Sequence, residues 1–103
     1  MAYKVVETRS AGKDIAEILG YIAGTLGNLP AAALFADELA SKYESLSENP
    51  YMYEQSRDLL LKSRGYRRVV IKNYVMLYLV DQAAREVHIV RVIYGGRDYA
   101  ELI

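Results

Sequence analysis

The apolar residues of this chain change their spacing partway along, and this change limits the possible folds more than any other feature. Two segments of the first half, residues 10–27 and 30–48, carry apolar side chains at the three- and four-residue spacing of amphipathic helices. Three later segments, residues 66–71, 74–81 and 86–94, are rich in β-branched residues and tyrosine and are joined by links short enough for hairpin turns. Helices followed by a run of strands indicate an α+β fold.

A short β-branched run at residues 3–7 predicts one more strand before the helices. The predicted order is therefore β-α-α-β-β-β, with a helical hairpin packed on a mostly antiparallel four-stranded sheet. Residues 74–80 hardly alternate between apolar and polar, as expected of a central strand covered on both faces. Residues 59–61 predict a brief helical turn between the helices and the strands. At 103 residues the chain has the length of one domain, which we expect to span residues 1–103.

The two predicted helices should form an antiparallel hairpin, because residues 28–30 leave only a short link between them. Ser10 is the expected N-cap of the first helix. The apolar face of that helix comprises Ile15, Ile18, Leu19, Ile22 and Leu26. A second stripe consists of the small residues Ala16, Gly20, Ala23 and Gly27. Since interior glycines weaken a helix, this stripe predicts that the second helix packs closely against it. On the second helix, Leu34 falls toward the polar side and is a candidate exposed anchor for a partner.

The composition excludes several classes of site. There is no cysteine, so disulfides, thiolate metal sites and a cysteine nucleophile are excluded, and the only histidine, His88, excludes a site that needs two. His88 lies mid-strand, with no titratable neighbour near it in sequence, and is interpreted as a packed or edge histidine and not as a catalytic base. No phosphate-binding loop and no metal-ligand spacing is present, so we expect no metal and no cofactor. The chain begins without a signal-peptide core, and its longest apolar run is too short to cross a membrane, so we expect a cytoplasmic protein without membrane contact.

The formal net charge of zero hides a strong polarity along the chain. Residues 1–56 carry a net charge of −4 and residues 57–103 a net charge of +4, and residues 57–72 alone carry +5. The basic cluster consists of Arg57, Lys62, Arg64, Arg67, Arg68 and Lys72. Such a cluster attracts phosphate groups or an acidic protein surface, but it is equally consistent with solvated charges that keep a sheet edge from aggregating. Adjacent strand residues point to opposite faces, so either Arg67 or Arg68 is expected to pair with a carboxylate.

The segment after the last predicted strand has two readings. Gly95 and Gly96 precede Arg97 and Asp98. Two glycines in this position can shape a nest of backbone N–H groups for a phosphate. A simple strand exit with an Arg-Asp ion pair explains the same residues.

The second half of the chain also carries an ordered set of family motifs. These are Arg64–Val70, Asn73–Asp81, Val87–Val92 and Gly95–Tyr99. In this order and spacing they resemble the RelE/ParE superfamily, the toxins of type II toxin–antitoxin modules, which include plasmid stabilisation proteins. The resemblance implies the same β-α-α-β-β-β fold. It also implies growth inhibition, a cognate antitoxin that wraps and neutralises the toxin, and contact with operator DNA only through that antitoxin.

Members of this superfamily divide into two chemistries. RelE-like toxins cleave mRNA in the ribosome, whereas ParE-like toxins poison DNA gyrase by binding it. By the resemblance, Val75 stands where RelE-like members place a catalytic arginine, Val69 where they place a lysine, and Ile103 near their C-terminal tyrosine. Because nothing clearly supplies a general acid or base, the favoured function is a non-enzymatic gyrase inhibitor. Its target- or antitoxin-binding residues would be the basic cluster together with Arg97.

Two alternatives remain open from the sequence. One is a ribosome-dependent mRNA endonuclease, or mRNA interferase. In that case Arg64, Arg67 and Arg97 would surround the scissile phosphate, and Tyr99 would donate a proton. The other is an antitoxin-binding homologue that has lost its toxicity.

Overall fold

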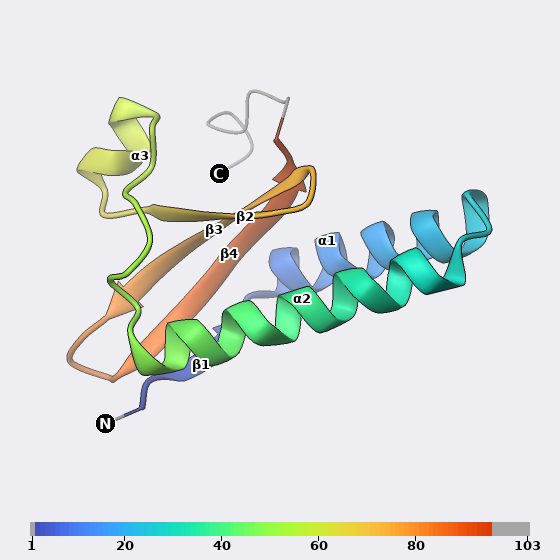
Figure 1. The fold of residues 1–103 in the computed structure, drawn as a ribbon. Coiled ribbons are helices and arrows are strands. Elements are labelled where there is room, and N and C mark those ends of the chain that lie inside the picture. Colours follow the sequence, from blue (N-terminus) through green and yellow to red (C-terminus); the bar gives the residue numbers. More distant parts are fainter. Residues whose placement is uncertain (1, 96–103) are drawn as a thin grey trace.

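The computed structural model describes residues 2–95, in which a helical hairpin covers one face of a four-stranded sheet (Figure 1). The strands lie in the order β1-β4-β3-β2. β1 is parallel to β4, and the other two pairs are antiparallel. The elements are β1 (Lys4–Glu7), α1 (Arg9–Gly20), the π-helix η1 (Tyr21–Thr25), α2 (Leu29–Glu48), α3 (Leu59–Ser63), β2 (Arg67–Ile71), β3 (Tyr74–Asp81) and β4 (Glu86–Tyr94). The predicted α+β fold and its element order are confirmed, including the short helical turn that becomes α3.

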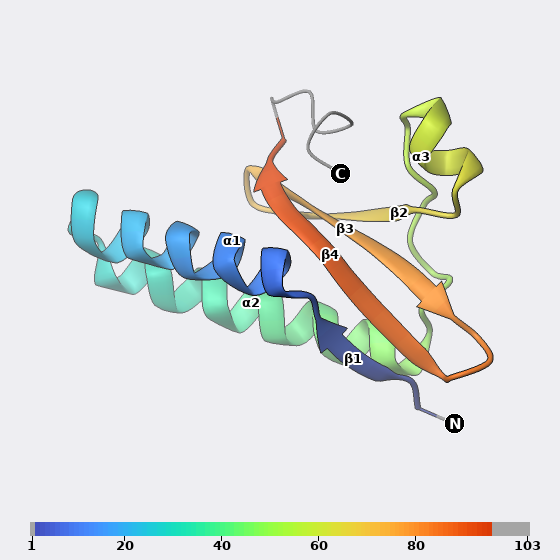
Figure 2. The same ribbon diagram turned by 180° about the vertical axis from the view of Figure 1, so that it is seen from behind.

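Two apolar cores lie on opposite sides of the sheet, and β3 contributes to both. The larger core lies between the sheet and the hairpin; Phe35, Leu46 and Tyr78 are among its most buried side chains. The smaller core contains Leu61 of α3 together with sheet residues such as Leu77. Figure 2 shows α3 and the α1–α2 hairpin on well-separated parts of the fold. The prediction that the middle strand is covered on both faces is confirmed. No helix in residues 2–95 combines the length and the apolar character that a membrane crossing requires.

The first helix begins earlier than the sequence predicted. Thr8, not Ser10, is the N-cap: its Oγ1 accepts a hydrogen bond from the backbone N–H of Ala11 at 3.1 Å. The same hydroxyl donates to the carbonyl oxygen of Val90 on β4 at 3.0 Å. Because β1 remains paired with β4 as far as Glu7, the turn into the helix falls at the next residue.

The predicted close packing of small residues in the hairpin is wrong. Ala16 and Gly20 are exposed. A Cβ atom placed on Gly20 or Gly27 would meet no atom within 4 Å. Gly27 has a φ of +61°, which side chains rarely adopt, so glycine there serves the turn between the helices. The two helices instead share the larger core through their apolar faces.

The predicted burial of Leu26 is also wrong. After Gly20 the α-helix gives way to η1, where the N–H of Leu26 bonds to the carbonyl oxygen of Tyr21 at 2.9 Å, five residues back. The wider turn rotates the following residues away from the α-helical face. In addition, the tip of the hairpin projects past the sheet (Figure 1). Leu26 is therefore 58% exposed.

Candidate functional site

Part of the basic cluster has a structural role, because arginines of the cluster hold residues 50–57 against the sheet. Nη1 of Arg67 donates to the carbonyl oxygen of Tyr53 at 2.8 Å, and the guanidinium carbon lies 5.1 Å from the centre of the Tyr51 ring. Nearby, the buried hydroxyl of Tyr78 donates to the carbonyl oxygen of Pro50 at 2.8 Å. Arg67 is thus engaged with the segment that follows α2.

Arg68 is the arginine that pairs with a carboxylate, which confirms that prediction. Its buried guanidinium bonds to Oε1 of Glu54, and its backbone N–H donates to the carbonyl oxygen of Glu54 at 3.0 Å. The hydrogen bond from Arg68 lowers the pKa of the Glu54 carboxyl. Arg57 donates from Nε to the same oxygen at 3.1 Å. Two cations of the cluster therefore share one carboxylate.

Two cations at the C-terminal end of α3 lack such partners among the described residues. Lys62 lies in the last turn of α3 and Arg64 directly after it, and both are exposed. Neither forms an ion pair with another side chain within residues 2–95. The helix beneath them is fixed by Asp58, whose side chain accepts from the N–H of Leu61 at 3.0 Å, and by the burial of Leu61 itself. The C-terminal end of α3 thus presents two positive charges that have no ion-pair partner within residues 2–95, on a fixed backbone.

Lys72 lies apart from these two cations. It occupies the β2–β3 turn, with Nζ 3.6 Å from Oε2 of Glu38 on α2. A five-residue strand, roughly 16 Å long at the usual rise, separates it from the α3 end of β2. The structure therefore divides a cluster that is continuous in sequence. Arg97 and Tyr99, also predicted as site residues, and the glycine-containing segment before them lie outside or at the limit of the described residues.

An apolar groove of about 390 Å³ lies between the hairpin tip and the end of the sheet. It is lined by Tyr21, Ile22, Leu26, Asn28, Ala31, Leu34, Phe35, Lys72, Asn73, Tyr74 and Tyr94. The ring of Phe35 packs edge-on against Tyr74 at 5.6 Å, and Tyr74 meets Tyr94 in the same way at 6.0 Å. Leu34 is 59% exposed, so its predicted exposure is confirmed. Exposed apolar side chains gathered around a groove are typical of a protein-binding surface.

Sequence reasoning missed most of this groove. It placed Leu26 in the core, and it gave no role to Tyr21 or Tyr94. The sequence feature that could have indicated the groove is the spaced glycines Gly20, Gly24 and Gly27, which mark the point where the regular helix ends. Tyr21 and Tyr94 line the same groove only because β4 packs against α1, and no local sequence pattern contains that packing.

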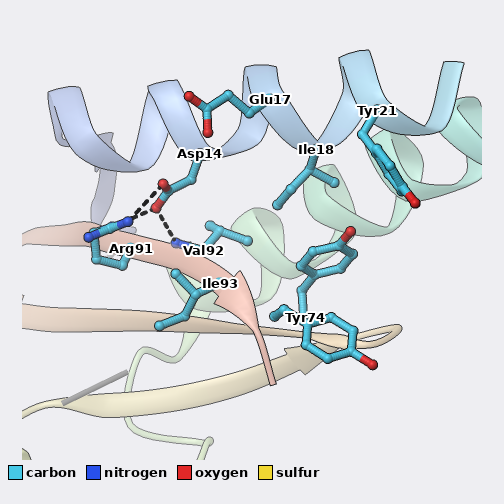
Figure 3. Close-up of a pocket in the computed structure, with 9 residues that line it drawn as sticks. Asp14, Glu17, Ile18, Tyr21, Tyr74, Arg91, Val92 and Ile93 are labelled. Atoms are coloured by element: carbon cyan, nitrogen blue, oxygen red, sulfur yellow. Dashed lines mark hydrogen bonds and ion pairs between the residues drawn. The ribbon is translucent and has the colours of Figure 1, made fainter. Parts of the chain in front are cut away.

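Beside the groove, an ion pair between α1 and β4 lines a second pocket (Figure 3). Nε of Arg91 donates to Oδ2 of Asp14 at 2.7 Å and Nη2 donates to Oδ1 at 3.0 Å, while the N–H of Val92 donates to Oδ2 at 3.0 Å. The hydrogen bond to Asp14 raises the pKa of Arg91. A carboxylate that accepts three hydrogen bonds is suited to holding the helix on the strand. The sequence did not indicate this pair.

The sequence interpretation of His88 as a residue without titratable neighbours is wrong. Its Nε2 lies 3.1 Å from Oε1 of Glu86, two residues earlier on β4. Residues two apart on a strand point to the same face, so the neighbour could have been recognised from the sequence.

The lowered pKa of Glu54 predicts a specific acid sensitivity. The carboxylate form stabilises the folded state above the ordinary pKa of 4.5, and this contribution is lost as the pH falls through the lower folded-state pKa. We therefore expect Glu54→Gln to lower the melting temperature at pH 7 and to flatten its decline below about pH 4.5. Circular dichroism melts across the acid range measure this effect. Glu44→Gln, at an exposed position on α2, is the matched control, and equal slopes for the two variants would contradict the assignment.

Comparison with known proteins places these features in context. The family model described as the ParE toxin of the type II toxin–antitoxin system parDE matches residues 5–99. A chain of the chromosomal ParDE TA system from P. aeruginosa has 15% identity and a TM-score of 0.69, covering 90% of this chain and 96% of its own. A chain of the toxin–antitoxin complex RelBE2 from Mycobacterium tuberculosis has 25% identity and a TM-score of 0.60, covering 91% of this chain and 99% of its own. No curated protein sequence matches the chain.

Proposed function

This chain belongs to the ParE toxin family of type II toxin–antitoxin systems, and on that basis we propose that it arrests growth in the cytoplasm by binding DNA gyrase, with a cognate antitoxin that neutralises it. The two solved structures compared above come from toxin–antitoxin systems, which supports an antitoxin as a partner of this chain. The proposal assigns binding, and no bond cleavage, to the toxin itself.

The burial of two valines is the observation that favours gyrase, and not the ribosome, as the target. Val75 and Val69 stand where the resemblance places the catalytic arginine and lysine of RelE-like toxins. Both valines are buried, Val75 in the smaller core and Val69 in the larger core on the other side of the sheet. Neither position can present a cation to a scissile phosphate. Arg67, a third position of that set, is engaged with backbone carbonyl groups, so the described residues favour binding over RNA cleavage.

The structure offers two separate surfaces for two partners. The apolar groove suits an amphipathic segment of the antitoxin, because apolar side chains would cover Leu26 and Leu34 while an acidic residue could approach Lys72 at the rim. The α3 cations, Lys62 and Arg64, suit an acidic target surface. We assign the groove to the antitoxin and α3 to the target.

Induced expression without an antitoxin tests the function as a whole. We expect growth arrest with activation of a DNA-damage reporter, rescue by co-expression of the antitoxin encoded beside this chain, and accumulation of gyrase cleavage complexes with pure protein. Arrest of translation with cleaved A-site mRNA would establish the endonuclease alternative instead. Normal growth at verified levels of folded protein would indicate an inert homologue.

Two variants separate the surfaces. Lys62→Glu combined with Arg64→Glu is expected to weaken gyrase inhibition at least about tenfold by charge repulsion, while antitoxin affinity is retained. Leu34→Glu is expected to weaken antitoxin binding at least about tenfold, while gyrase inhibition is retained. Lys13→Glu and Met52→Glu are matched exposed controls for the charge and the apolar change. Loss of both activities in either variant, with folding intact, would contradict the division of surfaces.

A further inference from the structure

The turn end of the β3–β4 hairpin gathers three metal-ligating side chains on one face of the sheet. Asp81 and Glu86 are direct partners in the antiparallel pair. His88 follows Glu86 by two residues and so shares its face. One donor atom from each of the three side chains lies within 4.8 Å of the others, and Nε2 of His88 lies 3.1 Å from Oε1 of Glu86.

This face is open to solvent, whereas the alternate residues of β4 are not. Val87 and Ile89 point into the larger core, so Glu86 and His88 point to the other side of the sheet, where both are partly exposed. Asp81 is fixed in place because its Oδ1 accepts a hydrogen bond from the N–H of Ala84 at 3.0 Å. An ion could therefore reach three donors whose backbone positions are set by the hairpin.

The cluster carries negative charge that nearby basic side chains do not neutralise. Carboxylates directly opposite each other on paired strands repel. Lys4 is the partner of Glu86 on β1, yet within residues 2–95 it forms no ion pair with that carboxylate. The Arg85 guanidinium lies over the Tyr3 ring at 5.5 Å. Asp81 likewise has no ion-pair partner within this part of the chain.

We propose that Asp81, Glu86 and His88 form a binding site for a zinc ion. One imidazole nitrogen and two carboxylate oxygens are ligands that zinc accepts, and three protein ligands leave the fourth tetrahedral position to water. Ligand atoms around tetrahedral zinc lie about 3.4 Å apart, close to the 3.1 Å separation of the His88 and Glu86 donors. A donor atom of Asp81 lies within 4.8 Å of both, so the three side chains need only close in on the ion. The ion would clamp β3 to β4 beside the first strand, whose Lys4 N–H bonds to the carbonyl oxygen of Arg85 at 2.9 Å.

The composition of the chain makes the test unusually clear. His88 is the only histidine and cysteine is absent, so zinc bound through an imidazole must use His88, provided that the protein carries no histidine tag. Zinc chloride titrated into the whole chain is expected to bind at one site per molecule by calorimetry and to shift the Nε2 resonance of His88 by NMR. His88→Gln, Asp81→Asn and Glu86→Gln are each expected to raise the Kd for zinc at least about tenfold.

Control variants distinguish binding at this site from nonspecific attraction of zinc to exposed carboxylates. Glu44→Gln and Asp37→Asn, which change exposed carboxylates on α2, should leave the Kd for zinc unchanged. Magnesium should bind more weakly than zinc, because it prefers an all-oxygen octahedral shell. An absence of saturable zinc binding, or equal affinity in the original chain and in a folded His88→Gln variant, would overturn the proposal. It does not rest on the proposed toxin function, and growth assays cannot decide it.

Discussion

Replacement of Phe35 with alanine is expected to lower the free energy of unfolding by about 3–5 kcal/mol. Phe35 is only 1% exposed; it belongs to the larger core, and its ring packs edge-on against Tyr74. Truncation removes the burial of the ring and leaves a cavity that a helix fixed against a sheet cannot fully close. Because domains of this size are stable by about 5–15 kcal/mol, the loss is a large fraction of the total. Urea denaturation followed by circular dichroism measures it.

The neighbouring residue provides the control for this change. Leu34 is exposed on the same turn of α2, so Leu34→Ala should change the free energy of unfolding by less than about 0.5 kcal/mol. Because Phe35 also lines the groove, a variant that stays folded should bind the antitoxin more weakly as well. Equal denaturation midpoints for the two alanine variants would show that α2 does not pack on the sheet in this register.

Replacement of Asp14 with alanine is expected to cost about 3 kcal/mol of unfolding free energy. The change removes the three hydrogen bonds that the carboxylate accepts from Arg91 and from the backbone N–H of Val92. The two side chains are largely buried, so water replaces these bonds poorly. Chemical denaturation measures the loss. Hydrogen exchange should show that the Val92 amide exchanges faster, because α1 no longer holds this part of β4.

Glu17 is the matched control, because it lies one turn later on α1 and influences Arg91 through charge. Glu17→Ala should change the unfolding free energy by less than about 0.5 kcal/mol, as expected of an exposed side chain. A double-mutant cycle with Arg91→Ala isolates the pair and should give a coupling energy of about 1–3 kcal/mol. A coupling energy near zero would mean that the ion pair does not fasten the helix to the strand.

The elements whose formation is local could be predicted from sequence. β3 and β4 begin and end at the predicted residues, because unbroken apolar runs and short polar turns are visible in the residues themselves. The hairpin was also correctly identified, but the packing of its tip was not. Leu26 and the small-residue stripe were assigned from a constant helical period, and η1 changes that period where the hairpin leaves the sheet.

For the site residues, too, local features could be predicted from the sequence and long-range partners could not. Alternation on a strand was enough to predict that Arg67 and Arg68 diverge and that one of them pairs with a carboxylate. The partner, Glu54, was not predictable, because it comes from a segment that folds back along β2. The Asp14–Arg91 pair was not predicted, since it depends on which helix packs on β4. The grouping of Asp81, Glu86 and His88 was also missed, although strand alternation and the predicted β3–β4 hairpin could have indicated it.

Periodicity and ordered motifs were therefore enough to predict the element order, the fold class and the family. What the charges do depends on the tertiary structure. Among the described residues, the six cations that are clustered in sequence became two arginines that share Glu54, one arginine bound to carbonyl groups, two cations without ion-pair partners at the end of α3 and one lysine beside the groove. The physical reason is that charge is counted along the chain, whereas ion pairs and surfaces form between residues that packing brings together.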